Sequence, residues 1–230
     1  MSVILLEGVP QIEVQLRRSA RARRLSLRVS RLDGRVTLTV PHGVSERQVH
    51  AFAKEKAGWL RGALEGQPDA VDVELGVELP LAGHLYRLVK GQGRSVRLVD
   101  DHLHIPGAAD ATAAKAAGFL KAQARAWLQT ACAGYADDLG RPFGRITLRD
   151  TRSRWGSCSS EGNLNFSWRL AMAPPEVLNY VAAHEVAHLA EMNHSRRFWD
   201  VVTRLYGSHD AERRWLRTEG AALHRYRFRN

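Results

Sequence analysis

The residues best suited to chemistry lie together late in the chain. His184, Glu185 and His188 form the pattern H-E-x-x-H. On a helix, residues four apart share one face, so these two imidazoles could bind one metal ion. Glu185 follows the first imidazole and could take a proton from a water molecule beside that ion. The arrangement is typical of zinc hydrolases, which combine two histidine ligands with a glutamate base.

A third ligand is expected just after this helix. His194 follows at the histidine spacing of the metzincin pattern, although Glu191 stands where that pattern has glycine. Asn193 tolerates the left-handed conformation and could turn the chain back toward the metal. We predict that His194 completes a three-histidine Zn²⁺ site. The alternatives are side chains from later helices: Asp200, His209, Glu212 and Glu219.

The residues before the motif predict where its helix begins. Pro174 and Pro175 suit a first helical turn, and Glu176 suits its positive end. An apolar stripe follows at spacings of three and four, formed by Leu178, Ala182, Val186 and Leu189. We therefore expect a helix that buries one side and presents His184 and His188 on the other.

Neighbouring segments must position this helix. The alanine-rich segment 110–138 predicts a long buried helix, and residues 145–149 alternate as a strand does. A polar loop over 152–162 leads to residues 163–170, which alternate most regularly. We predict a strand there, whose polar edge could bind an extended peptide by strand addition.

The first half of the chain predicts mainly strands. Residues 12–16, 25–29 and 36–40 alternate, and Asp33-Gly34 is typical of a hairpin turn that would pair the last two of these strands. Six arginines between residues 17 and 28 would lie on the exposed face of this sheet, either solvated or binding anions. Ser45 with Gln48 forms a capping box that opens a helix to about residue 65. Short strands are expected around 73–81, 84–90, 95–99 and 102–105.

The predicted fold class is α+β, with a change of module at Pro106-Gly107. Residues 1–106 would form an N-terminal module rich in β-hairpins with one helix. Residues 107–230 would form a catalytic half dominated by helices, with a small antiparallel sheet.

Composition and net charge indicate the environment and the kind of partner to expect. The 230 residues are 44% hydrophobic and 25% charged, which is ordinary for a globular protein. We expect a cytoplasmic protein, because there is no run of membrane-spanning length and no basic leader, and Cys132 and Cys158 are too few for a disulfide framework. The net charge of +10 favours attraction to polyanions but does not by itself establish a nucleic-acid partner.

Three segments together resemble the YgjP-like metallopeptidase family. They are Arg154-Trp155-Gly156-Ser157-Cys158, the Asn163-Leu164-Asn165 strand and the stretch HEVAHLAEMNHSRRFW. The resemblance implies a zincin-like, metal-dependent hydrolase domain related to minigluzincin and SprT-like proteins. It also implies zinc held by His184, His188 and His194, with Glu185 as base. Our candidate substrate-binding residues are Arg154, Trp155, Asn163, Asn165 and Tyr180.

Two activities are compatible with such a site. The first is a zinc-dependent peptidase acting on a peptide or protein, in which Tyr180 or Arg154 could stabilise the oxyanion. The second is a nucleoside triphosphate pyrophosphatase, an activity on UTP that has also been attached to such proteins. Its phosphates could be held by Arg152, Arg154, Arg169, Arg196 and Arg197. A non-catalytic binding module is disfavoured, because a purely structural metal site needs no base. A nucleophilic role for Cys158 is also disfavoured against a packing role.

Overall fold

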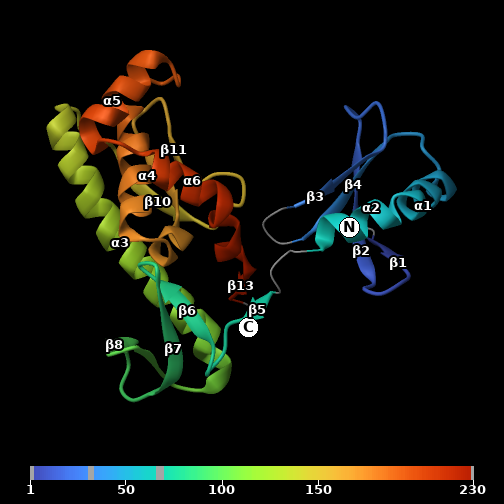
Figure 1. The fold of residues 1–230 in the computed structure, drawn as a ribbon, viewed down its shortest axis with the longest axis horizontal. Coiled ribbons are helices and arrows are strands. Elements are labelled where there is room, and N and C mark those ends of the chain that lie inside the picture. Colours follow the sequence, from blue (N-terminus) through green and yellow to red (C-terminus); the bar gives the residue numbers. More distant parts are fainter. Residues whose placement is uncertain (1–2, 31–33, 66–69, 229–230) are drawn as a thin grey trace. The chain divides into compact units, whose positions relative to one another are not determined.

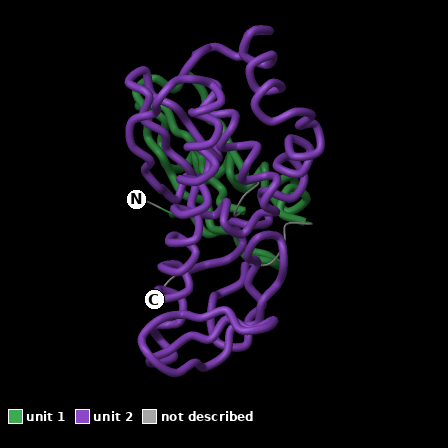
Figure 2. Tube along the Cα trace, turned by 90° about the vertical axis from the view of Figure 1, so that its left-hand side faces the viewer, with its two compact units in different colours: residues 1–69 green, residues 70–230 purple. Residues whose placement is uncertain are grey.

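The computed structural model describes residues 3–30, 34–65 and 70–228. The chain divides into two compact units, Met1–Asp69 and Ala70–Asn230 (Figure 2). This division lies earlier than the predicted change of module at Pro106-Gly107. The reason is that the strands between residues 78 and 106 share one hydrophobic core with the long helix that follows them. Leu88 and Leu120, for example, belong to the same cluster of buried residues.

The first unit is a four-stranded sheet with two short helices (Figure 1). Its strands, in the order β1-β2-β4-β3, are β1 (Val3–Leu6), β2 (Ile12–Ser19), β4 (Val36–Pro41) and β3 (Ser26–Val29). β2 and β4 pair in parallel, whereas β3 and β4 form the predicted antiparallel pair. Asp33, in the predicted turn, lies outside the described residues.

The helix predicted after Ser45 is two helices. Ser45 and Gln48 form the expected capping box at the start of α1 (Glu46–Glu55). The chain leaves helical geometry at Lys56 and resumes as α2 (Ala57–Leu64). Val49, Ala53 and Leu60 are buried, and both helices contribute to one core with the sheet.

The second unit begins with a sheet of its own. Its strands, in the order β6-β7-β9-β8, are β6 (Glu78–Leu81), β7 (His84–Gly91), β9 (His102–Pro106) and β8 (Arg97–Val99). A separate parallel pair joins β5 (Val71–Asp72) to β13 (Tyr226–Arg227), near the two ends of the unit.

The part of the second unit that carries the metal motif is a three-stranded sheet surrounded by helices (Figure 1). The sheet has the order β10-β12-β11, formed by β10 (Ile146–Arg149), β12 (Leu164–Ser167) and β11 (Gly156–Cys158). The helices are η1 (Ala109–Ala111), α3 (Thr112–Leu139), η2 (Trp168–Met172), α4 (Pro175–Ala187), α5 (Arg196–Tyr206), α6 (Asp210–Thr218) and η3 (Gly220–Arg225). α4 packs against α3, α5, α6 and β11.

The α+β class is confirmed, with three differences in this sheet. β10 pairs in parallel with β12, so the sheet is mixed rather than antiparallel. Its third strand, β11, pairs antiparallel with β12 but lies inside the segment 152–162 that was predicted to be a loop. The strand predicted over 163–170 ends at Ser167, because residues 168–172 form a 3₁₀ helix whose side chains are all buried. Among the described residues, no helix is long and apolar enough to cross a membrane.

Candidate metal centre

The helix that carries the motif lies at the centre of its unit. α4 begins where predicted, with Pro174 at the N-cap and Pro175 in the first turn. The expectation of one buried side was wrong, because residues on all sides of the helix are buried, including Ala183 and Glu185. This burial follows from packing against a sheet strand and three helices. The helix is therefore held rigidly, which suits a group that must keep its geometry.

Three imidazoles converge at the end of this helix. The ligand atoms of His184, His188 and His194 all lie within 4.8 Å of one another, and the Nε2 atoms of His184 and His194 are 3.1 Å apart. Tetrahedral zinc with bonds of about 2.0–2.1 Å holds its ligand atoms about 3.3 Å apart, so the three imidazoles fit one ion with small adjustments. The donor set is therefore suited to a metal, with His194 as third member as predicted.

The chain turns sharply to bring His194 to the other two. α4 ends at Ala187, and His188 is its C-cap residue. Ser195 then caps α5 by accepting a hydrogen bond from the Phe198 backbone N–H at 3.4 Å. The rival ligand His209 is placed differently, because it stacks on Tyr180 at 5.5 Å between ring centroids.

Two contacts orient the imidazoles. The Tyr180 hydroxyl lies 3.5 Å from Nδ1 of His184, and the Glu191 carbonyl lies 3.0 Å from Nδ1 of His188. In both rings Nε2 is thus left for a metal, as is usual where the second ring nitrogen is held by a polar neighbour. Burial and the neighbouring imidazoles lower the pKa of His184 to about 3, and burial lowers that of His188. Both rings are therefore neutral at pH 7, the state that binds metal.

An aromatic side chain supports all three rings from α5. Phe198 is fully buried, and its ring centroid lies 4.9 Å from that of His184, 4.5 Å from that of His188 and 4.8 Å from that of His194. Trp199 stacks on His194 at 5.8 Å. The sequence pattern did not connect Phe198 with the three histidines. His194 lies in the turn before α5, and side chains four residues apart meet reliably only within one helix.

Glu185 points to the sheet side of α4. It is 5% exposed, and burial raises its pKa to about 8, an effect that the Arg154 charge opposes. The neighbour on the sheet is Gly156, where an added Cβ would lie 2.5–2.7 Å from side-chain atoms of Glu185. A glycine is therefore required here so that β11 and the carboxyl group can approach. Sequence analysis did not identify this contact.

The five candidate substrate-binding residues fall into different surroundings. Arg154 is exposed, near Glu185, and Asn165 accepts a hydrogen bond from Arg149 Nε at 3.5 Å on the outer side of the sheet. Trp155 packs against His224, with ring centroids 5.4 Å apart.

The remaining two candidates make internal contacts. Asn163 Oδ1 accepts a hydrogen bond from the Arg145 backbone N–H at 3.2 Å, which braces the start of β10. Tyr180 is 5% exposed and faces His184. These placements favour positioning roles for Asn163 and Tyr180. Binding of substrate by any of the five stays a prediction.

Cys158 lies in a setting that suppresses thiol chemistry. Burial, together with the nearby Glu185 carboxylate, raises its pKa to about 11, and the same two causes raise the pKa of Cys132 to about 12. Because the thiolate is the reactive form, neither cysteine is activated as a nucleophile at neutral pH.

A cluster of three histidines, with a glutamate next to the first of them on a buried helix, is typical of a metallopeptidase centre, and comparison with known proteins agrees. The sequence matches the family described as YgjP-like, metallopeptidase domain, over residues 23–219. The chain belongs to this family. No curated protein matches the sequence. Among solved structures, the metallopeptidase zymogen of Pyrococcus abyssi abylysin is similar at 20% identity, over 40% of this chain and 95% of that chain, with a TM-score of 0.36.

Proposed function

We propose that the protein is a zinc-dependent peptidase whose metal is held by His184, His188 and His194. The observation that carries this proposal is the convergence of three imidazoles, with ligand atoms within 4.8 Å of one another. Such a donor set suits zinc better than magnesium or calcium, which prefer oxygen ligands. Bound zinc would polarise the scissile carbonyl and acidify a water molecule.

Glu185 would supply the proton transfers. It would accept a proton from the attacking water and pass it to the leaving amine. Burial raises the pKa of this carboxyl group, which favours its acceptance of a proton from the water. The close contact with Gly156 would hold the carboxyl group in place. The roles of Tyr180 and Arg154 differ in this proposal, since Tyr180 would orient His184, whereas Arg154 would face substrate.

The peptide would bind at a strand edge other than the one predicted. β12 has β10 on one side and β11 on the other, so residues 164–167 have no edge for strand addition. β11 is a terminal strand of this sheet and packs against α4. An extended substrate pairing with β11 would therefore run beside the metal ligands.

Replacement of the proposed base tests this function. We expect Glu185→Gln to lower peptide turnover by about 10²–10⁴-fold, because general-base catalysis contributes that much. Zinc content should stay near one ion per chain. The matched control is Glu176→Gln, which removes an exposed carboxylate from the first turn of the same helix. Full activity of the Glu185 variant, measured by peptide cleavage with metal analysis, would contradict the proposal.

The second candidate function is a metal-dependent pyrophosphatase acting on a nucleoside triphosphate such as UTP. The observation that favours it is the position of Arg154 near Glu185. Arg169, also expected to hold phosphates, is instead buried and bound to Asp150 by contacts of 2.7 and 3.2 Å. Release of pyrophosphate from UTP by zinc-loaded protein, lost in Glu185→Gln, would support this candidate.

A further inference from the structure

The three-stranded sheet has a polar face on the side away from Glu185. Side chains alternate along a strand, and the register pairs Ser157 with Asn165 and Gly156 with Phe166. Gly156 touches Glu185, so the face that carries Gly156 and Phe166 is the one turned to the metal helix. Ser157, Asn165 and, on β10, Arg149 belong to the opposite face.

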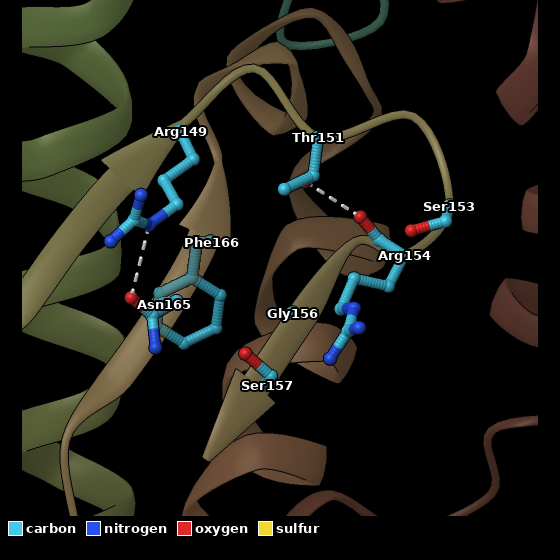
Figure 3. A pocket seen from close by; sticks show the side chains of 8 residues that line it. All are labelled: Arg149, Thr151, Ser153, Arg154, Gly156, Ser157, Asn165 and Phe166. Atoms are coloured by element: carbon cyan, nitrogen blue, oxygen red, sulfur yellow. Dashed lines mark hydrogen bonds between the residues drawn. The ribbon is translucent and has the colours of Figure 1, made fainter. Parts of the chain in front are cut away.

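This opposite face contains a pocket of about 310 Å³ (Figure 3). Arg149 and Asn165 lie on one side of the hollow and Arg154 on the other, with Ser157 between them. The lining residues come from the ends of the three strands and from the β10–β11 loop, and they are Arg149, Thr151, Ser153, Arg154, Gly156, Ser157, Asn165 and Phe166.

Hydrogen bonds within the lining hold its polar groups in place. Asn165 Oδ1 accepts from Arg149 Nε at 3.5 Å, which turns the Asn165 amide NH₂ away from Arg149. The Thr151 hydroxyl donates to the Arg154 carbonyl at 2.8 Å and thereby fixes the loop that carries Arg154. Two guanidinium groups, an amide NH₂ and hydroxyl groups are the donors that bind carboxylates and phosphates in proteins.

The charge around the pocket is positive. None of its 8 lining residues is acidic. The nearest carboxylate in sequence, Asp150, is bound to Arg169 by two contacts, and Arg169 also donates to the carbonyls of Leu223 and Tyr226. Glu185 lies against Gly156 on the face turned to the metal helix, and it interacts with the positive charge of Arg154. Arg149 therefore faces this pocket without a carboxylate among the other lining residues.

We propose that this pocket is a specificity site for an acidic side chain, Asp or Glu, of a peptide substrate. The inference rests on the proposed peptidase function. A peptide paired with the edge of β11 would place alternate side chains on the two faces of the sheet. One set would face the metal helix, and the neighbouring side chain would reach Arg149, Arg154 and Ser157. Gly156 on β11 both lines the pocket and touches Glu185, so the pocket and the proposed base lie on the two faces of the same strand.

The test compares peptides that differ only in one Glu or Gln, moved along an alanine-based sequence. For the zinc-loaded full chain we expect one position at which kcat/KM is at least tenfold higher with Glu. Arg149→Gln should reduce this preference to less than threefold, chiefly by lowering kcat/KM for the Glu peptide. The matched control is Arg145→Gln, an exposed arginine before β10 that does not line the pocket, and it should keep the full preference.

Binding measured without turnover separates this inference from the proposed function. Zinc-loaded Glu185→Gln should bind the Glu peptide at least fivefold more tightly than the Gln peptide, and the added Arg149→Gln change should remove the difference. If this binding difference is found but the wild-type protein cleaves no peptide, the pocket assignment is supported and the proposed peptidase function is wrong. Cleavage without any preference for Glu at any position would overturn the pocket. Loss of affinity for UTP, but not for acidic peptides, in Arg149→Gln would overturn the peptide assignment in favour of a phosphate ligand.

Discussion

At the scale of single residues, the proposed base packs against a residue without a side chain. An added Cβ at Gly156 would lie 2.5–2.7 Å from Glu185, so Gly156→Ala must displace the carboxyl group or β11. We expect kcat to fall by about 10²-fold, since a displacement of about 1 Å can have that effect. Zinc affinity should change only a few-fold, because the histidines do not contact this position. Peptide turnover and zinc titration measure the two effects.

The control for this change is a glycine in open space. At Gly134, on the exposed side of α3, an added Cβ meets no atom within 4 Å. Gly134→Ala should leave turnover unchanged and stabilise the protein by about 0.5–1 kcal/mol through helix propensity. Equal turnover in Gly156→Ala and wild type would show that Glu185 does not depend on this contact.

The cluster of three imidazoles was predictable at this scale because spacing alone implies its geometry. Residues four apart meet on a helix, and Asn193 could be recognised as a turn residue before His194. The contacts of Glu185 with Gly156, and of Phe198 with the three imidazoles, were not predictable in the same way. They join segments far apart in sequence or depend on the turn between two helices, which local patterns do not determine.

At the scale of elements, η3 covers the residue that precedes β11. His224 on η3 is 8% exposed and contacts Trp155 with ring centroids 5.4 Å apart. Burial, aided by the Arg169 charge, lowers the pKa of His224 to about 4 from its ordinary value of 6.5. The folded chain thus keeps this ring neutral at pH values where the unfolded chain protonates it.

This difference predicts a loss of stability in acid. Between about pH 6.5 and pH 4, His224 is protonated in the unfolded state but neutral in the folded state. The stabilisation that is present above pH 6.5 is therefore lost as the pH falls through this range. We expect His224 to contribute roughly 1–3 kcal/mol of this loss. Urea unfolding at pH 7 and pH 4.5 should show a smaller pH dependence in His224→Phe than in wild type. Identical pH dependence in the two proteins would contradict this assignment.

Helices and strands were predicted well where a single hydrophobic pattern determines them, and poorly where side chains on both faces are buried. The long helix α3 and the strand β10 follow the expected periodicities, whereas β11 lies in a segment predicted to be a loop. The alternation over 163–170 continues past Ser167, yet the buried Arg169 bonds to Asp150 and to the Leu223 and Tyr226 carbonyls, contacts that belong to the 3₁₀ turn of η2. A partner 54 residues away cannot be recognised from alternation.

At the scale of the whole molecule, the two units have separate hydrophobic cores. Leu38 is fully buried in the core of the first unit, and Leu164 is fully buried in that of the second. We expect Leu38→Ala to lower the stability of the first unit by about 2–5 kcal/mol. Hydrogen exchange should lose protection in β2 and β4 while α4 stays protected and zinc remains bound.

The reciprocal substitution is the control. Leu164→Ala should reduce protection in β10, β12 and α4 and weaken zinc binding, while leaving β2 and β4 protected. Loss of protection in α4 caused by Leu38→Ala would show that the two cores unfold together. The division at residues 69 and 70 was not evident from composition, because the strands after it have the same short, turn-rich character as those before it.

The pairing of β5 with β13 has a consequence for how the second unit could be combined with other polypeptides. Val71 lies opposite Tyr226 and Asp72 opposite Arg227, so the chain enters and leaves this unit at one location. Adjacent entry and exit points are the geometry that lets a folded unit be spliced into a surface loop of another protein. The sequence that flanks this unit could therefore be exchanged during evolution without disturbing the helix that carries the histidines.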